Sequence, residues 1–160
     1  MIVVRIRDGI IDHLPVRISE WYMGCMLLQL SVRLLLPGDT FGSSHSYDLM
    51  AAVSRDLLPL ANPETVWGVL TFVVSGSRLG GLAANGTFKV LRRWSPLVRS
   101  IMALLGAATW FMIATGMYIS NRDGTGSGTY YGLAIGDLLL AVWVSGEAGH
   151  AYRRHRHAVA

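Results

Sequence analysis

The chain has 160 residues, of which 52% are hydrophobic and 15% are charged, and its formal net charge is +4. A soluble domain carries about 25% charged residues, so this composition predicts one domain whose main solvent is lipid rather than water. The positive charges cluster beside apolar runs, which favours anionic headgroups as contacts, and we expect no nucleic-acid partner. The single cysteine, Cys25, excludes an internal disulfide.

The first segment, residues 1–19, mixes apolar residues with charges. We interpret it as a short strand or an amphipathic piece, and we favour a frayed or interfacial tail. Asp8, Asp12 and Glu20 precede the first apolar run, and no small-residue cleavage site follows that run. These features are not those of a signal peptide, so we expect the first helix to remain in the mature protein.

The first predicted membrane span covers about residues 20–36. Pro37 and Gly38 follow it directly and are typical of a helix stop. The span is short for a hydrocarbon core of about 30 Å, so we expect the guanidinium of Arg33 to snorkel outward.

A second, shorter helix is predicted over about residues 46–60, in the first external connection. Tyr47, Met50, Val53 and Leu57 recur there at helical spacing, while charged residues fall on other faces. Two interpretations are equally good at this point. The helix lies on the outer membrane surface, or it packs across the mouth of a helix bundle.

The second span has a clear start, since Asn62 is suited to cap a helix and Pro63 to occupy its first position. The third contains the longest charge-free stretch of the chain, which is long enough to cross a bilayer alone. The remaining predicted spans cover about residues 64–84, 97–120 and 129–150, and a basic tail covers 151–160.

Successive loops between these spans would lie on opposite sides of the membrane, and the loop cations are unevenly divided between the two sides. Ten would share one side, namely Arg5, Arg7, Arg17, Lys89, Arg92, Arg93, Arg99, Arg153, Arg154 and Arg156, against two on the other, Arg55 and Arg122. Lys and Arg are retained on the cytoplasmic side of short loops. We therefore predict an all-α, four-transmembrane-helix bundle with both termini in the cytoplasm, placed multi-pass in the bacterial inner membrane. Cations beside the spans, namely Arg92, Arg93, Arg153, Arg154 and Arg156, are expected to contact lipid headgroups. The competing interpretation is a soluble helical bundle.

Four ionisable residues fall inside the predicted spans, where each is a functional candidate because charge is costly there. Matching their depths at about 1.5 Å per residue predicts two pairs, Arg33 with Asp137 and Arg78 with Glu147. Gln29 is a further predicted partner of Asp137. Either these pairs only hold helices together, or Asp137 is a proton- or cation-responsive carboxylate in a water-filled cavity.

Smaller polar and glycine patterns accompany these charges. Thr71, Ser75 and Arg78 form a polar stripe on one face of the second span, more often interhelical contact than pore lining. Two GxxxG patterns are predicted to let helices approach closely, namely Gly76 with Gly80 and Gly132 with Gly136. Such patterns serve packing within one chain or a homo-oligomer, and the sequence does not separate the two.

No pattern for catalysis or cofactor binding is present in the sequence. It contains no HExxH, CxxC, Walker or GxSxG motif, and no histidine falls in the middle of a predicted span. We therefore expect no catalytic residues, no metal, no cofactor and no enzymatic activity.

The layout resembles small uncharacterised membrane proteins of bacteriophages and prophages. The residues that carry this resemblance are Trp21, Pro37 to Phe41, Ser46 and Tyr47, Trp67 through Gly76, Arg78 and Asn85, then Trp110, Tyr131 and the terminal arginine cluster. The resemblance implies a holin, a superinfection-exclusion factor or an inner-membrane accessory. Unlike the common holin, this chain has four predicted spans and charges within them.

The sequence thus leads to a non-enzymatic, phage-type membrane protein that acts by assembly in, or modification of, the host membrane. Its predicted contacts are membrane lipids and a second copy of the chain. Two alternatives stay open, a small ion-coupled transporter or channel using intramembrane carboxylates, and a structural subunit of a larger membrane complex.

Overall fold

A computed structural model describes residues 2–85, 95–120 and 126–159, with side chains described for residues 17–44, 46–83, 96–119 and 126–146. Within these ranges the chain is helical and contains no strand, as predicted. The elements are α1 (Ile2–Leu35), the 3-10 turn η1 (His45–Tyr47), α2 (Asp48–Leu57), α3 (Pro63–Asn85), α4 (Ser95–Ser120) and α5 (Gly126–Val159). The segment predicted as a basic tail therefore continues α5 as helix up to Val159.

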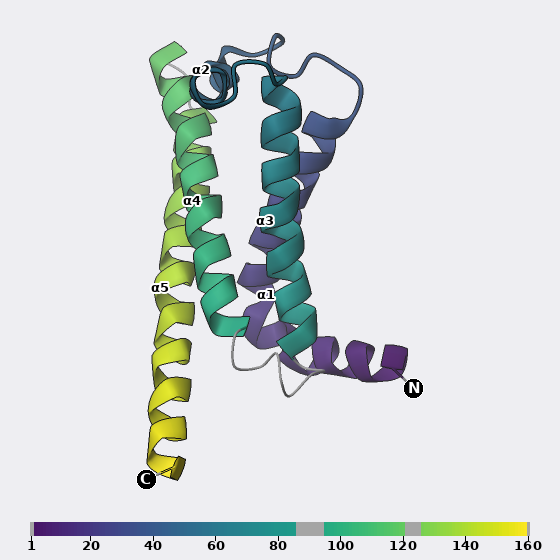
Figure 1. Ribbon diagram of the computed structural model, residues 1–160, viewed down its shortest axis with the longest axis vertical. Coiled ribbons are helices and arrows are strands. Elements are labelled where there is room, and N and C mark those ends of the chain that lie inside the picture. The colour runs from purple at the N-terminus through teal and green to yellow at the C-terminus, as the bar shows by residue number, and fades with distance from the viewer. Residues whose placement is uncertain (1, 86–94, 121–125, 160) are drawn as a thin grey trace.

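Helix α1 bends sharply at Arg17, whose φ of −123° and ψ of 18° are not helical. Pro15 lies two residues earlier, and proline inside a helix removes one backbone hydrogen bond and favours a kink. Figure 1 shows the residues before the kink turned aside across the base of the molecule. The strand interpretation of residues 1–19 is therefore wrong over the described part, because helical continuity outweighs the β-branched residues there.

The four long helices form two antiparallel hairpins. Helix α1 packs along α3, α4 packs along α5, and α3 joins the two pairs by packing against α4. We call α1 with α3 the first hairpin, α4 with α5 the second hairpin, and the boundary between them the seam. Figure 1 shows both chain ends at one end of the bundle and α2 at the other.

The start of α3 follows the predicted signals. The side-chain Oδ1 of Asn62 accepts a hydrogen bond of 2.8 Å from the backbone N–H of Glu64, and Pro63 occupies the first helical position. Glu64 in turn accepts a 2.8 Å hydrogen bond from the backbone N–H of Phe41. This contact ties the external connection to the end of the first hairpin.

Helix α2 packs across the mouth of the bundle, at the end opposite the chain termini. Met50 is fully buried, and its carbonyl accepts a 2.8 Å hydrogen bond from the indole Nε1 of Trp67 on α3. The backbone carbonyl of Ser46 lies against Gly116 of α4, where a side chain would not fit. Of the two interpretations of this helix, the structure thus favours the one that closes the mouth.

An aromatic pair borders the same mouth. The rings of Phe41 and Tyr47 stack with centroids 5.1 Å apart and planes 3° from parallel. Burial raises the pKa of the Tyr47 hydroxyl, as does Tyr130, while Arg33 acts weakly in the opposite direction.

Three helical segments are long and apolar enough to cross a membrane: Pro63–Ala83, Pro96–Ile119 and Gly126–Gly146. They coincide with the second, third and fourth predicted spans. Helix α1 does not meet the same criterion among the described residues. Glu20, Gln29 and Arg33 dilute its apolar character, so the first crossing stays a prediction.

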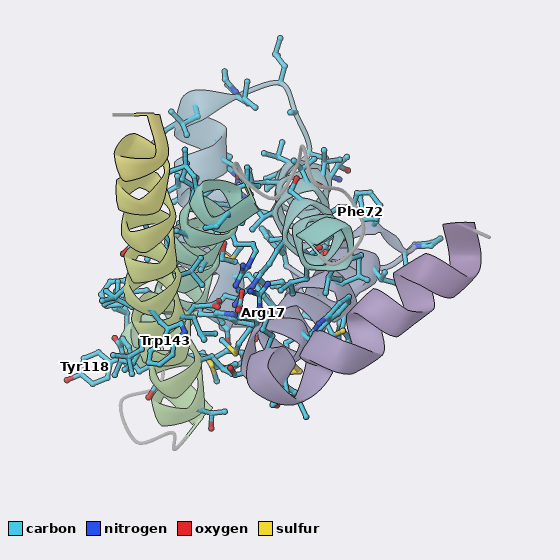
Figure 2. The ribbon with its side chains drawn as sticks, turned by 90° about the horizontal axis from the view of Figure 1, so that it is seen from below. Arg17, Phe72, Tyr118 and Trp143 are labelled. Carbon is cyan, nitrogen blue, oxygen red and sulfur yellow. The ribbon has the colours of Figure 1, made fainter. Side chains whose placement is uncertain are left out.

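Large apolar side chains cover the outside of the bundle, and the interior combines an apolar core, with Leu27, Val74 and Ile113 among its residues, with buried polar side chains. Phe72, Tyr118 and Trp143 are 51%, 53% and 70% exposed, and Figure 2 shows them pointing away from the bundle. The buried polar side chains are Glu20, Ser31, Ser54, Thr71, Ser75, Arg78, Arg99, Ser100, Thr109 and Asp137. The buried charged residues are paired, as burial requires, and the feature that departs from a soluble bundle is the extent of exposed apolar surface.

Candidate functional site

The centre of the candidate site is a buried ion pair between α3 and α5. The guanidinium Nη1 of Arg78 donates to Oδ1 of Asp137 across 2.5 Å, and the two residues are 1% and 0% exposed. Gly106 of α4 makes room for the carboxylate, since a Cβ there would lie 2.5 Å from Oδ2 of Asp137 and 2.9 Å from Leu27 Cδ1. Arg78 thus reaches across the seam to the opposite hairpin.

This central pair is incompletely satisfied by protein atoms. Among the described residues, Nε and Nη2 of Arg78 and Oδ2 of Asp137 are buried without a hydrogen-bond partner. The indole Nε1 of Trp110 faces Asp137 without reaching hydrogen-bond geometry. Each buried polar atom left unpaired costs about 1–3 kcal/mol, so the centre has unused capacity for a small polar guest.

A second ion pair lies toward the end of the bundle that holds the chain termini. Arg99 of α4 donates through Nε to Glu20 Oε2 across 2.8 Å and through Nη2 to Oε1 across 2.5 Å. Both residues are buried and both carboxylate oxygens are used. This two-pronged contact is the strong geometry of an arginine–carboxylate pair. Figure 2 shows Arg17, at the kink of α1, at the same end near the middle of the bundle.

The sequence did not identify this second pair. Arg99 was counted among the cytoplasmic loop cations and Glu20 stood at the very start of the first predicted span, so neither entered the depth comparison. Glu20 and Arg99 lie at nearly equal distances from the predicted inner ends of the first and third spans, and this match in depth could have identified them as partners.

The predicted pairing of Arg33 with Asp137 is wrong, because Asp137 pairs with Arg78. Arg33 and Gln29 are both exposed on α1. The depth comparison placed charges at the backbone, whereas an arginine side chain spans roughly one helical turn of about 5.4 Å. The side chain of Glu147, the predicted partner of Arg78, lies outside the described side chains.

The predicted polar stripe is buried as a unit. Thr71 and Ser75 are 0% exposed, and their hydroxyls donate to carbonyls of their own helix, Trp67 at 2.7 Å and Phe72 at 3.2 Å. Ser31 of α1 is also fully buried, and its Oγ has no partner. The hydroxyls of Thr71 and Ser75 therefore do not bond the helices to one another, and with Ser31 they place polar groups within the apolar core between Arg78 and α2.

The GxxxG glycines do not mediate packing within this chain, which corrects that part of the prediction. A Cβ on Gly76, Gly80 or Gly132 would meet nothing within 4 Å, and one on Gly136 would meet only Met23 Cε at 3.9 Å. The close approaches between long helices occur instead at Gly24, Gly68, Gly106 and Gly126, and Gly116 lies against the backbone of Ser46. The side chains of the predicted headgroup contacts Arg92, Arg93, Arg153, Arg154 and Arg156 lie outside those described.

The described side chains contain no group of three or more histidine, cysteine or acidic residues placed to hold a metal ion. Comparison with protein-family models, curated proteins and solved structures finds no match to this chain.

Proposed function

We propose that the chain is an integral membrane protein that crosses the bacterial inner membrane four times, with both termini in the cytoplasm. The observation that supports this is the distribution of side chains, with ion pairs inside and large apolar residues outside. In water such a surface drives association, whereas acyl chains solvate it in a bilayer.

The first crossing rests on α1. From Ile18 to Leu35 the helix is about 27 Å long at about 1.5 Å per residue, close to the hydrocarbon thickness. It packs along α3 and exposes Tyr22, Val32 and Leu35 to the outside. Its polar residues Glu20 and Ser31 are turned inward, as expected for a span within a bundle.

We further propose that the protein acts by assembly in, or modification of, the host membrane, in the manner of holin-like or superinfection-exclusion proteins, and not as an enzyme. The layout of the sequence supports the phage-type assignment. The geometry supports an action within the bilayer, because two pairs of ionisable residues, Arg78 with Asp137 and Arg99 with Glu20, meet inside the bundle.

The test is controlled expression in a bacterium, followed by alkaline carbonate extraction and by growth and membrane-potential measurements. We expect the protein to resist extraction and its induction to lower the membrane potential or block infection. Protein released by carbonate would refute the membrane assignment. Full retention with no effect on potential, growth or infection, together with a co-purifying partner, would replace this function by that of a complex subunit.

A second candidate, an ion-coupled transporter or channel, is favoured by one observation. Asp137 holds a carboxylate oxygen without a partner in the middle of a helix bundle. An ionisable group kept in such a place is a functional candidate by default.

A further inference from the structure

The two buried ion pairs join the same two hairpins but differ in construction. Arg78–Asp137 links α3 to α5, and Glu20–Arg99 links α1 to α4, so each crosses the seam. Glu20 uses both carboxylate oxygens and Arg99 uses two nitrogens. Asp137 uses one oxygen, and Arg78 one of its three side-chain nitrogens. The central pair therefore keeps buried hydrogen-bonding capacity that its contact between the helices does not use.

Water is the guest that best fits the unused groups of the central pair. The partnerless atoms include donors, Arg78 Nε and Nη2 with Trp110 Nε1, and an acceptor, Asp137 Oδ2. Buried waters typically make about three hydrogen bonds to otherwise unsatisfied polar groups. A water molecule can both donate and accept a proton, so a water hydrogen-bonded to Asp137 Oδ2 could exchange protons with the carboxylate.

Buried polar groups lie on both sides of the centre along the length of the bundle. Toward α2 lie the buried hydroxyls of Ser75, Thr71 and Ser31. Toward the end with the chain termini lie Ser100, whose hydroxyl donates to the Ala141 carbonyl within the second hairpin, and the Glu20–Arg99 pair, which crosses the seam. Among the described side chains, α3 faces Asp137 with Arg78, α4 with Gly106 and Trp110, and α1 with the apolar Leu27. Arg78 is thus the charged group that opposes Asp137.

We propose that protons cross the membrane along the seam by way of Asp137. A hydronium ion on the outer side transfers its proton to the Asp137 carboxylate, leaving water and a neutral acid. Arg78 stays cationic but loses its opposite charge, which weakens the tie between the hairpins. The acid then passes its proton to water on the other side, and the ion pair re-forms. This proposal rests on the four-span placement above and names the ion that such a membrane protein would carry.

The test reconstitutes the full chain in phosphatidylcholine–phosphatidylglycerol vesicles that contain a pH-sensitive dye and potassium. Valinomycin imposes a potential, negative inside, that draws protons inward. We expect wild-type vesicles to acidify faster than protein-free vesicles, and Asp137→Asn to return the rate to the protein-free level. The matched control is Asp56→Asn, on the exposed face of α2, which we expect to keep the wild-type rate.

Two results would overturn the proposal: wild-type vesicles that acidify no faster than protein-free ones, or Asp137→Asn vesicles that match wild type. Where Asp137→Asn does not fold, Asp137→Glu replaces it. That variant keeps an ionisable carboxyl, so its proton flux should persist with an altered pH profile, and an unchanged profile would equally reject Asp137 as the carrier. Carbonate extraction of the same vesicles shows whether the protein is inserted, which separates failure of this proposal from failure of the membrane placement.

Discussion

Replacing Gly106 with alanine tests whether the seam is as tightly closed at its centre as the structure indicates. The added Cβ would lie 2.5 Å from Asp137 Oδ2 and 2.9 Å from Leu27 Cδ1. Neither side chain can move away easily, since Asp137 is held by its ion pair with Arg78 and Leu27 is fully buried. The substitution should therefore push the two hairpins apart or break the ion pair.

The size of the destabilisation follows from comparison with Gly76→Ala, because a Cβ at position 76 meets nothing within 4 Å. Both substitutions gain the same intrinsic helix preference of alanine over glycine, about 1 kcal/mol at most. The difference between the two variants isolates the overpacking cost, which is typically about 1–3 kcal/mol. That difference corresponds to about five- to 150-fold in the ratio of folded to unfolded protein.

The assay is unfolding of the purified protein by titration with dodecyl sulfate in mixed micelles, followed by tryptophan fluorescence. Gly106→Ala should unfold at lower denaturant than wild type, and Gly76→Ala at equal or higher denaturant. Equal midpoints for the two variants would refute the close approach of α4, α5 and α1 at this position.

Three further predictions use the same preparation. Arg78→Ala and Asp137→Ala should each lower the unfolding free energy by about 3–5 kcal/mol, because each leaves one charge buried without its partner. The double variant should lose less than the sum of the two, since it leaves no lone charge. Strictly additive losses in this double-mutant cycle would show that the two side chains do not meet. The raised pKa of Tyr47 means that the folded state prefers the neutral phenol, so its stabilising effect is complete below pH 10.0 and is lost as the pH rises through the folded-state pKa. Tyr47→Phe should remove this alkaline loss, measured by unfolding at a series of pH values, and an identical loss in both proteins would contradict the burial of the hydroxyl. Trp67→Phe deletes the hydrogen bond to the Met50 carbonyl. The substitution should lower the unfolding free energy by about 0.5–1.5 kcal/mol and speed proteolysis within α2. An unchanged rate of cleavage in α2 would mean that this hydrogen bond does not hold the helix in place.

The helices could be predicted from the sequence because hydropathy and capping act locally. The apolar runs gave the three candidate spans, and Asn62 with Pro63 gave the start of α3. Local signals also predicted a helix in the first external connection. Its packing against Trp67 could not be read from the sequence, since that depends on how α3 and α4 are placed.

The pairing of charges could be predicted only in part, because it depends on helix rotation and on side-chain length. Arg78 and Asp137 were both identified as intramembrane candidates, but each was assigned to another partner. The partner of Asp137 is set by the packing of α3 against α4, which turns Arg78 into the seam and leaves Arg33 exposed. In the same way, the spacing of Gly76 and Gly80 is regular, yet rotation of α3 turns both away from the other helices, and Gly106, which belongs to no such pattern, makes the close contact.

The number and direction of the crossings test the central claim most directly. Single cysteines placed at Ser44, Ser127, a position before Arg5 and the C-terminus, in a Cys25→Ala background, are exposed to a membrane-impermeant maleimide in intact spheroplasts. Four crossings predict labelling at Ser44 and Ser127 from outside, and labelling at the two chain ends only after the membrane is opened. Labelling of the N-terminal site from outside in intact spheroplasts would contradict the account, because α1 would then not cross the membrane.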